Sequence, residues 1–286
     1  TGNKFKSASP GDFTVYCKYN SIKSNTSTFK IVDASAKPIT FTTNVLVEDI
    51  TGTWCGYCPR VAYKLQELQK KTSQLVVVAA HSGSTNSLDY EKVDVLKSTF
   101  GVAGFPWGIL NRKGTGDAGR WGEGDAQITS IAASPSKVGV AIESSITGRD
   151  LTVKIKAKFS EDYTGLKYVI YLLENDLKAT QRTYGDLGYG IGTEIPSGSD
   201  KWWLVDFEHK HVLRKALTSG PLGDAIDDSS SKKGSIFEKS HTYTIPAAYN
   251  KDKMEIVAFV VKSDKSVLNA RYSEFGKTQS FQEISN

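Results

Sequence analysis

An α/β part followed by an all-β part is the fold class that the sequence predicts, on three observations. In the first half, short continuous apolar runs such as residues 75–80 alternate with stretches of helical spacing, as in a buried parallel sheet with helices. After Pro135 the hydrophobic period changes to two, as in residues 151–159. The 286 residues are also enough for two or three domains with separate cores.

These patterns divide the chain into three segments. Residues 1–43 are expected to form a short β-rich N-terminal segment, residues 44–135 the α/β domain, and residues 136–286 a β-sandwich domain. Strand candidates in the first segment, separated by turn residues, are 13–19, 28–32 and 39–42.

Composition excludes several classes of protein. The content of 39% hydrophobic and 23% charged residues is that of a globular protein, and no stretch approaches the roughly 20 apolar residues that span a bilayer. The formal net charge of +5 is small for this length. Because no Lys/Arg cluster is interleaved with aromatic residues, we reject nucleic acid as a partner. We expect no cofactor.

Two cysteines separated by two residues, Cys55 and Cys58, are the main chemical signal. Residues 44–50 upstream indicate a buried strand, and the apolar spacing over 61–68 downstream indicates an amphipathic helix. The pair is therefore expected at a strand-to-helix junction, with Cys55 at the helix N-terminus, where free N–H groups favour a thiolate. Zinc would need a second ligand pair, and none is suitably spaced, so redox chemistry is favoured and no metal is expected.

The run Trp54-Cys55-Gly56-Tyr57-Cys58, after a strand and at the start of a helix, resembles the active site of the thioredoxin superfamily. Phe105-Pro106, ahead of an apolar run at 107–110, matches the cis-proline that faces the cysteines in that superfamily. Asp49 matches its buried acid, six residues before the first cysteine. The resemblance covers about residues 44–135 and implies a thioredoxin-like domain.

The resemblance also implies a role for each site residue. Cys55 is the expected nucleophile and Cys58 the resolving thiol, whose proton Asp49 would accept. Pro106 is expected to be cis and to let an extended substrate backbone lie beside the sulfur atoms. The residues expected to contact substrate are Trp54, Gly56, Tyr57 and Phe105.

A narrower resemblance concerns residues 48–55 and the run 209–214. Both are similar to the outer-membrane protein 28 related family of Gram-negative envelope lipoproteins, whose members join a thioredoxin-like domain to β-domains. This implies an extracytoplasmic, outer membrane-associated location, facing the periplasm or the cell surface. A lipid-bearing cysteine, upstream of Thr1, would be the chain's only link to the membrane.

The rest of the α/β domain follows from periodicity. Residues 75–80 predict a central strand, Val93, Leu96 and Phe100 define a second helix, and a third is expected at about 125–133. His81 ends the central strand and is interpreted as a surface or capping residue rather than a catalyst.

In the last segment, six or more strands with short turns predict an immunoglobulin- or fibronectin-like β-sandwich. The strand candidates are 138–142, 151–159, 167–173, 236–245, 254–261 and 267–272.

A long insertion interrupts these strands. Its glycine-rich part, 184–192, lacks the lysine and the strand-to-helix setting of a phosphate loop. Trp202-Trp203 and Phe207 are interpreted as core packing or loop plugging in preference to a ligand-stacking surface. His209 and His211 would share a face on a strand and could hold a metal, but no third ligand is evident.

The third cysteine, Cys17, is expected on the same face of a strand as Phe13, Val15 and Tyr19, because these residues fall at every second position. We interpret it as a buried, inert thiol rather than a third redox partner.

Two functions compete. The first is thiol–disulfide exchange with protein thiols or disulfides in the cell envelope, favoured by the cysteine pair together with Asp49 and Pro106. The alternative is a redox-silent module that binds an envelope protein or a glycan through the β-sandwich and its aromatic insertion.

Overall fold

The structure is a computed structural model of the whole chain, and it describes residues 7, 9–31, 39–83, 87–185 and 197–284. Two compact units divide the chain, one over Thr1–Pro38 and the other over Ile39–Ser285.

The first unit is a small antiparallel ribbon. Strand β1 (Gly11–Val15) pairs with β4 (Ser27–Ile31), and the rings of Phe13 and Phe29 stack with centroids 5.9 Å apart. Cys17 is exposed, so the prediction of a buried thiol is wrong. The reason is that β1 ends at Val15, before the alternation reaches the cysteine. The other strands here are β2 (Lys18–Tyr19) and β3 (Ile22–Lys23).

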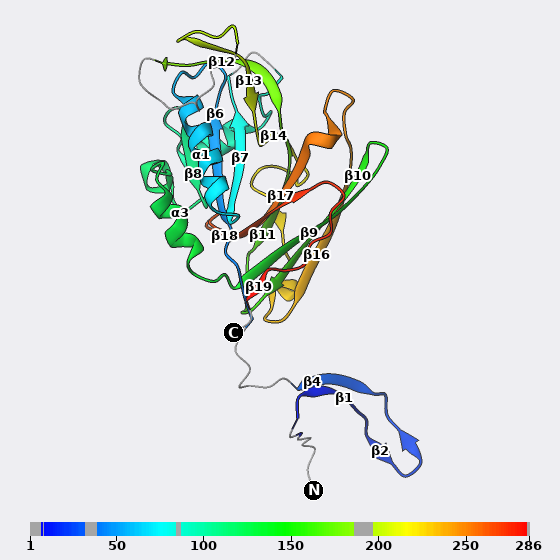
Figure 1. Cartoon of the computed structure of the whole chain (residues 1–286). Coiled ribbons are helices and arrows are strands. Elements are labelled where there is room, and N and C mark those ends of the chain that lie inside the picture. Colours follow the sequence, from blue (N-terminus) through cyan, green and yellow to red (C-terminus); the bar gives the residue numbers. More distant parts are fainter. Residues whose placement is uncertain (1–6, 8, 32–38, 84–86, 186–196, 285–286) are drawn as a thin grey trace. The chain divides into compact units, whose positions relative to one another are not determined.

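An eight-stranded mixed sheet forms the centre of the second unit (Figure 1). Its order is β18-β17-β11-β14-β7-β6-β8, with β15 paired to β11. Strands β6 and β7 are parallel, whereas β8 is antiparallel to β6. The strands are β6 (Val45–Thr51), β7 (Leu75–His81), β8 (Trp107–Leu110), β11 (Lys167–Glu174), β14 (Val212–Ala216), β15 (Asp224–Ala225), β17 (Met254–Val261) and β18 (Val267–Glu274).

Three α-helices occur in the described residues, each where the sequence predicts one: α1 (Cys58–Lys71), α2 (Val93–Phe100) and α3 (Asp125–Ala132). Helix α1 lies along β6 and β7 (Figure 1) and buries its apolar stripe against one face of them. Their other face packs in a second core, so both strands are buried along their whole length. None of the described helices has the length and apolar character needed to cross a membrane.

A second, three-stranded sheet has the order β16-β10-β9. Its β9–β10 hairpin turns at Gly148, whose φ of 63° suits glycine, and its inward residues share a core with the face of the large sheet formed by β11 and β17. These strands, with the three helices, agree with the predicted combination of α/β and β structure. They are β9 (Val138–Thr147), β10 (Asp150–Phe159) and β16 (Ile236–Thr244).

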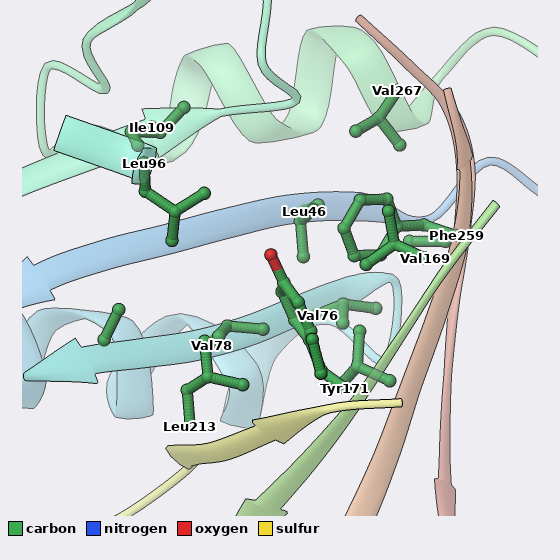
Figure 2. Close-up of a cluster of buried hydrophobic side chains, with 14 of the residues drawn as sticks. Leu46, Val76, Val78, Leu96, Ile109, Val169, Tyr171, Leu213, Phe259 and Val267 are labelled. Atoms are coloured by element: carbon green, nitrogen blue, oxygen red, sulfur yellow. The ribbon is translucent and has the colours of Figure 1, made fainter. Parts of the chain in front are cut away.

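The large sheet draws strands from both sides of Pro135, because β11, β14, β17 and β18 continue the sheet of β6–β8. Figure 2 shows the shared core, in which Leu46 and Val76 meet Tyr171 and Phe259. The division into segments 44–135 and 136–286 stays a prediction about which parts fold alone.

A buried ion pair lies in the same region. The Arg112 guanidinium donates two hydrogen bonds of 2.6 Å to the Glu48 carboxylate and one of 2.8 Å to the Tyr171 hydroxyl. Glu48 and Arg112 are both fully buried, so each depends on the other for compensation of its charge.

The remaining elements are short. Strands β12 (Leu177–Arg182) and β13 (Trp203–His209) pair as a ribbon at the end of β6 and β7 from which the cysteine loop leaves (Figure 1). The others are β5 (Thr40–Phe41), β19 (Glu283–Ile284) and the 3₁₀ turns η1 (Gly116–Gly119), η3 (Asp228–Ser231) and η4 (Lys251–Lys253).

Candidate functional site

The two cysteines lie in the loop between β6 and α1, and they form a disulfide. Helix α1 begins at Cys58, so Cys55 lies in the turn before the helix rather than in it. The amide of Cys55 donates to the Gly52 carbonyl and that of Cys58 to the Cys55 carbonyl, at 3.0 and 3.2 Å. Cys55 is 4% exposed and Cys58 1%, which places Cys55 nearer to solvent.

Asp49 is a buried acid on the same side of the sheet as α1. It lines a small cavity together with Cys58, and its Oδ1 makes no hydrogen bond to any residue that the structure describes. Burial raises the pKa of Asp49 from 3.8 to about 7. The carboxyl therefore changes protonation near neutral pH, as a group that exchanges a proton with a thiol must.

The Phe105-Pro106 peptide bond is cis and precedes β8, the strand antiparallel to β6. The Trp54 ring packs on Phe105 with centroids 5.1 Å apart, and its Nε1 donates a 2.8 Å hydrogen bond to the Ser82 carbonyl. The predicted site residues thus lie around the end of β6: Asp49, Trp54, Cys55, Gly56, Tyr57, Cys58, Phe105 and Pro106.

Residues from the far half of the chain complete this loop, and the sequence analysis missed them. Gln181 donates from Nε2 to the Cys55 carbonyl at 2.9 Å, and the Tyr184 amide donates to the Gly56 carbonyl at 3.1 Å. The Tyr184 ring packs on Tyr57 with centroids 4.8 Å apart. It lies so close to Gly56 that a Cβ there would be 2.7 Å from the ring, so a larger residue would have to displace the ring.

An aromatic surface continues from Tyr184. Trp202 and Trp203 are 43% and 45% exposed, so of the two interpretations, core packing or loop plugging, core packing is wrong for both. The Arg182 guanidinium lies over the rings of Tyr184 and Trp203, 5.3 and 5.8 Å from their centroids. Of the glycine-rich run, residues 186–192 lie outside the described part.

The histidines also differ from expectation. His81 is buried rather than at the surface, because the end of β13 covers it, and its Nε2 lies 3.2 Å from His209 Nδ1. Strand β13 ends at His209 and the backbone turns, so His211 contacts Glu255 and Gln69 instead, at 2.9 and 3.0 Å. Among described residues no group of three or more ligand-type side chains could hold a metal ion.

Burial changes the acidity of both paired rings. It lowers the pKa of His81 to about 3 and that of His209 to about 4, so both are neutral at physiological pH. A signal for His81 was available in the sequence. It falls at an even spacing from Val77 in a buried strand, on the face that packs against α1. Nothing local indicated its contact with His209.

The chain has relatives of known structure. Residues 93–279 match the profile of the family described as outer membrane protein Omp28. HBP35 of Porphyromonas gingivalis is 20% identical with a TM-score of 0.65, over 83% of this chain and 76% of that chain. At this identity the likeness concerns the fold alone.

Two further structures are more distant. A protein from Agrobacterium tumefaciens is 15% identical, with a TM-score of 0.49 over 84% of this chain and 97% of that chain. A domain of the outer membrane lipoprotein Omp28 from Porphyromonas gingivalis is 16% identical, with a TM-score of 0.29 over 49% of this chain and 88% of that chain. No curated protein sequence matches the chain.

The profile match spans more than half of the sequence. It confirms the expected extracytoplasmic, outer membrane-associated location, and of the two runs that carry the narrower resemblance it includes residues 209–214. The chain is a member of the outer membrane protein Omp28 family.

Proposed function

We propose that this protein exchanges thiols and disulfides with other proteins of the cell envelope through Cys55 and Cys58. The observation that supports this best is the buried carboxyl of Asp49 beside Cys58, whose Oδ1 has no hydrogen-bond partner among the described residues and whose pKa is near 7. A purely structural disulfide has no need of such a group, and burying it without a partner costs stability.

The reaction begins with the reduced pair. The Cys55 thiolate attacks a substrate disulfide and forms a mixed disulfide, and the first substrate sulfur leaves as a thiolate. Asp49 accepts the proton of the Cys58 thiol. The Cys58 thiolate then attacks the sulfur of Cys55, the bond to substrate breaks, and the Cys55–Cys58 disulfide closes.

Substrate contacts would come from the exposed side of the loop. Trp54 and Tyr57 are 45% and 41% exposed and flank the less accessible Cys55. Phe105 packs on Trp54, whereas Gly56 lies buried under the Tyr184 ring, so the expected contact of Gly56 with substrate requires that ring to move. Pro106, which has no N–H, leaves a neighbouring carbonyl free to bind an extended substrate backbone.

For the fold we propose a thioredoxin-like domain over residues 44–135 and a β-sandwich over residues 136–286. The fold likeness to HBP35 and the order of β6, α1, β7, α2 and β8 along the chain support the first. Expression of residues 136–286 alone tests the boundary. Cooperative urea unfolding of the fragment would support it, and absence of such a transition would contradict it.

A lipid anchor upstream of Thr1 is the membrane link that we propose. Mass spectrometry of the N-terminal peptide from the native membrane fraction should detect acyl chains. An unmodified N-terminus in that fraction would refute the anchor without affecting the redox proposal.

Cysteine variants test the exchange reaction. The exposed Cys17 should first be replaced by Ser, so that only the pair reports. In that background Cys58→Ser should trap mixed disulfides through Cys55, and Cys55→Ser should abolish insulin reduction. The Cys17→Ser protein itself is the matched control and should retain full activity. Unchanged exchange in Cys55→Ser would refute the proposal.

The aromatic surface supports a second candidate, a redox-silent module that binds an envelope protein or a glycan. Trp202 and Trp203 are exposed beside cationic Arg182, an arrangement suited to stacking. Under this alternative, Trp202→Ala and Trp203→Ala abolish capture of the partner, whereas Cys55→Ser has no effect. Loss of capture in Cys55→Ser would favour the first function.

A further inference from the structure

Three polar atoms around the cavity beside Cys58 are buried and make no hydrogen bond of normal geometry to another described residue. They are Oδ1 of Asp49, Nδ1 of His81 and Nε2 of His209. Each such group costs about 1–3 kcal/mol, so three of them at one site require an explanation. All three side chains line the same cavity of about 30 Å³, which has room for roughly one or two water molecules.

The register of the sheet explains why these groups meet. Asp49 of β6 lies opposite Ala79 of β7, and His81 follows two residues later on the same face. Cys58 begins the helix that covers this face and lines the same cavity. The Cys58 sulfur, the Asp49 carboxyl and the His81 ring therefore share one small space.

The second histidine extends this space toward the surface ribbon. Nε2 of His81 and Nδ1 of His209 are 3.2 Å apart, so one hydrogen is shared between the two rings. A neutral imidazole accepts a proton at one nitrogen and donates from the other. The two rings in series therefore form one path from Nδ1 of His81 to Nε2 of His209. His209 is the last residue of β13.

We propose that His81 and His209 form a proton relay between the Asp49 carboxyl and solvent. The proposal rests on the thiol–disulfide exchange described above. As Asp49 takes the proton of the Cys58 thiol and the Cys58 thiolate closes the disulfide with Cys55, the proton passes on through the cavity to His81 and then to His209. The buried Nε2 of His209 gives it to a water molecule that enters from the surface ribbon. The substrate leaves as thiolates that are protonated from solvent, so protons and electrons balance. When a thiol reduces the disulfide, the relay delivers a proton inward.

The surroundings suit a neutral relay. Glu208 and Lys210 at the cavity pair with each other at 3.0 Å, and the helix side of the cavity offers only uncharged glutamines. Burial is the main cause that lowers the pKa of both histidines, and His209, then Arg214, lower that of His81 further. The backbone carbonyls of Ala79, at His81, and Ala179, at His209, raise the pKa values but are outweighed. Neither ring therefore holds a charge near neutral pH, so each can pass a proton on.

His211 provides a matched control. It lines the same cavity, but its two ring nitrogens are occupied by Glu255 and Gln69. His211→Gln should therefore leave the rate of the resolving step within about twofold of wild type, because it removes no relay nitrogen.

The test follows the resolving step by stopped flow from pH 6 to 9, with a small disulfide peptide as substrate. His209→Ala should slow it by about tenfold or more at pH 7, with the first attack by Cys55 unchanged. Added imidazole should restore the rate, since it fills the hole and shuttles a proton. Added 1-methylimidazole, whose neutral form has no N–H to donate, should restore the rate less.

Two results would overturn the relay. One is a wild-type rate of the resolving step in folded His209→Ala and His81→Phe, and the other is equal rescue by imidazole and 1-methylimidazole. Should neither variant fold, a proton inventory of the wild-type resolving step in H₂O/D₂O mixtures decides. A curved dependence indicates more than one proton in transit and supports the relay, and a linear one contradicts it. Failure of the proposed function is distinct, because wild-type protein would then exchange no disulfide at all.

Discussion

Replacing Asp49 by Asn removes one buried titrating group with little change of shape, so the pH dependence of the variant's stability isolates the carboxyl. The pKa of Asp49 is about 7 in the folded protein against an ordinary 3.8. Each pKa unit corresponds to about 1.4 kcal/mol, so ionisation of the buried carboxyl lowers the free energy of unfolding by about 4 kcal/mol.

The sign follows from the raised pKa. Below pH 3.8 the carboxyl is protonated in both folded and unfolded chains, and its contribution to stability is fully present. Between 3.8 and about 7 the unfolded chain loses the proton first, so this contribution is lost as pH rises. Asp49→Asn should match wild type near pH 4 and exceed its free energy of unfolding by about 4 kcal/mol above pH 8.

The assay is urea unfolding followed by tryptophan fluorescence from pH 4 to 8.5, with both proteins oxidised. His81 and His209 act in the opposite direction, since their lowered pKa values remove stability as pH falls below 6.5. They are present in both proteins and cancel in the difference. Asp117→Asn, at an exposed position, is the control and should stay within about 0.5 kcal/mol of wild type. A difference between Asp49→Asn and wild type that does not vary with pH would refute the reasoning.

Three further predictions follow from other contacts. Gly56→Ala should lower the free energy of unfolding by about 1–3 kcal/mol, because the new Cβ displaces the Tyr184 ring. In a Tyr184→Ala background the same substitution should cost much less, and equal losses in the two backgrounds would contradict the contact. Cys17, being exposed, should react with a thiol reagent in the folded protein, and labelling only after unfolding would contradict this. Glu48→Gln should cost about 3–5 kcal/mol in urea unfolding, because it leaves the buried charge of Arg112 uncompensated, and a loss below 1 kcal/mol would show that water reaches the pair.

Much of the secondary structure could be predicted because burial leaves a period in the sequence. The strict alternation of β10 and the helical spacing in α1 each reflect one buried face. The same period does not say which sheet a strand joins. The change at Pro135 therefore indicated a new kind of packing, while β11 and β17 still lie in one sheet with β6.

The site divides in the same way. Asp49, the cysteines and Pro106 were predictable, because short motifs place them at the ends of neighbouring strands. Gln181 reaches the Cys55 carbonyl across 126 residues, and no local pattern encodes such a contact. His81 was misjudged because a residue at the end of a strand is buried or exposed according to what covers it, here the end of β13.

The hydrogen bonds from residues 181–184 to the cysteine loop have a consequence for how the protein is made. Synthesis runs from the N-terminus, so both cysteines leave the ribosome more than a hundred residues before Gln181 and Tyr184. During that interval the loop lacks the partners that hold its carbonyls and pack on Tyr57. Correct pairing of Cys55 with Cys58 in its final surroundings is thus a late event. The state of this loop reports whether residues 181–184 have docked on it.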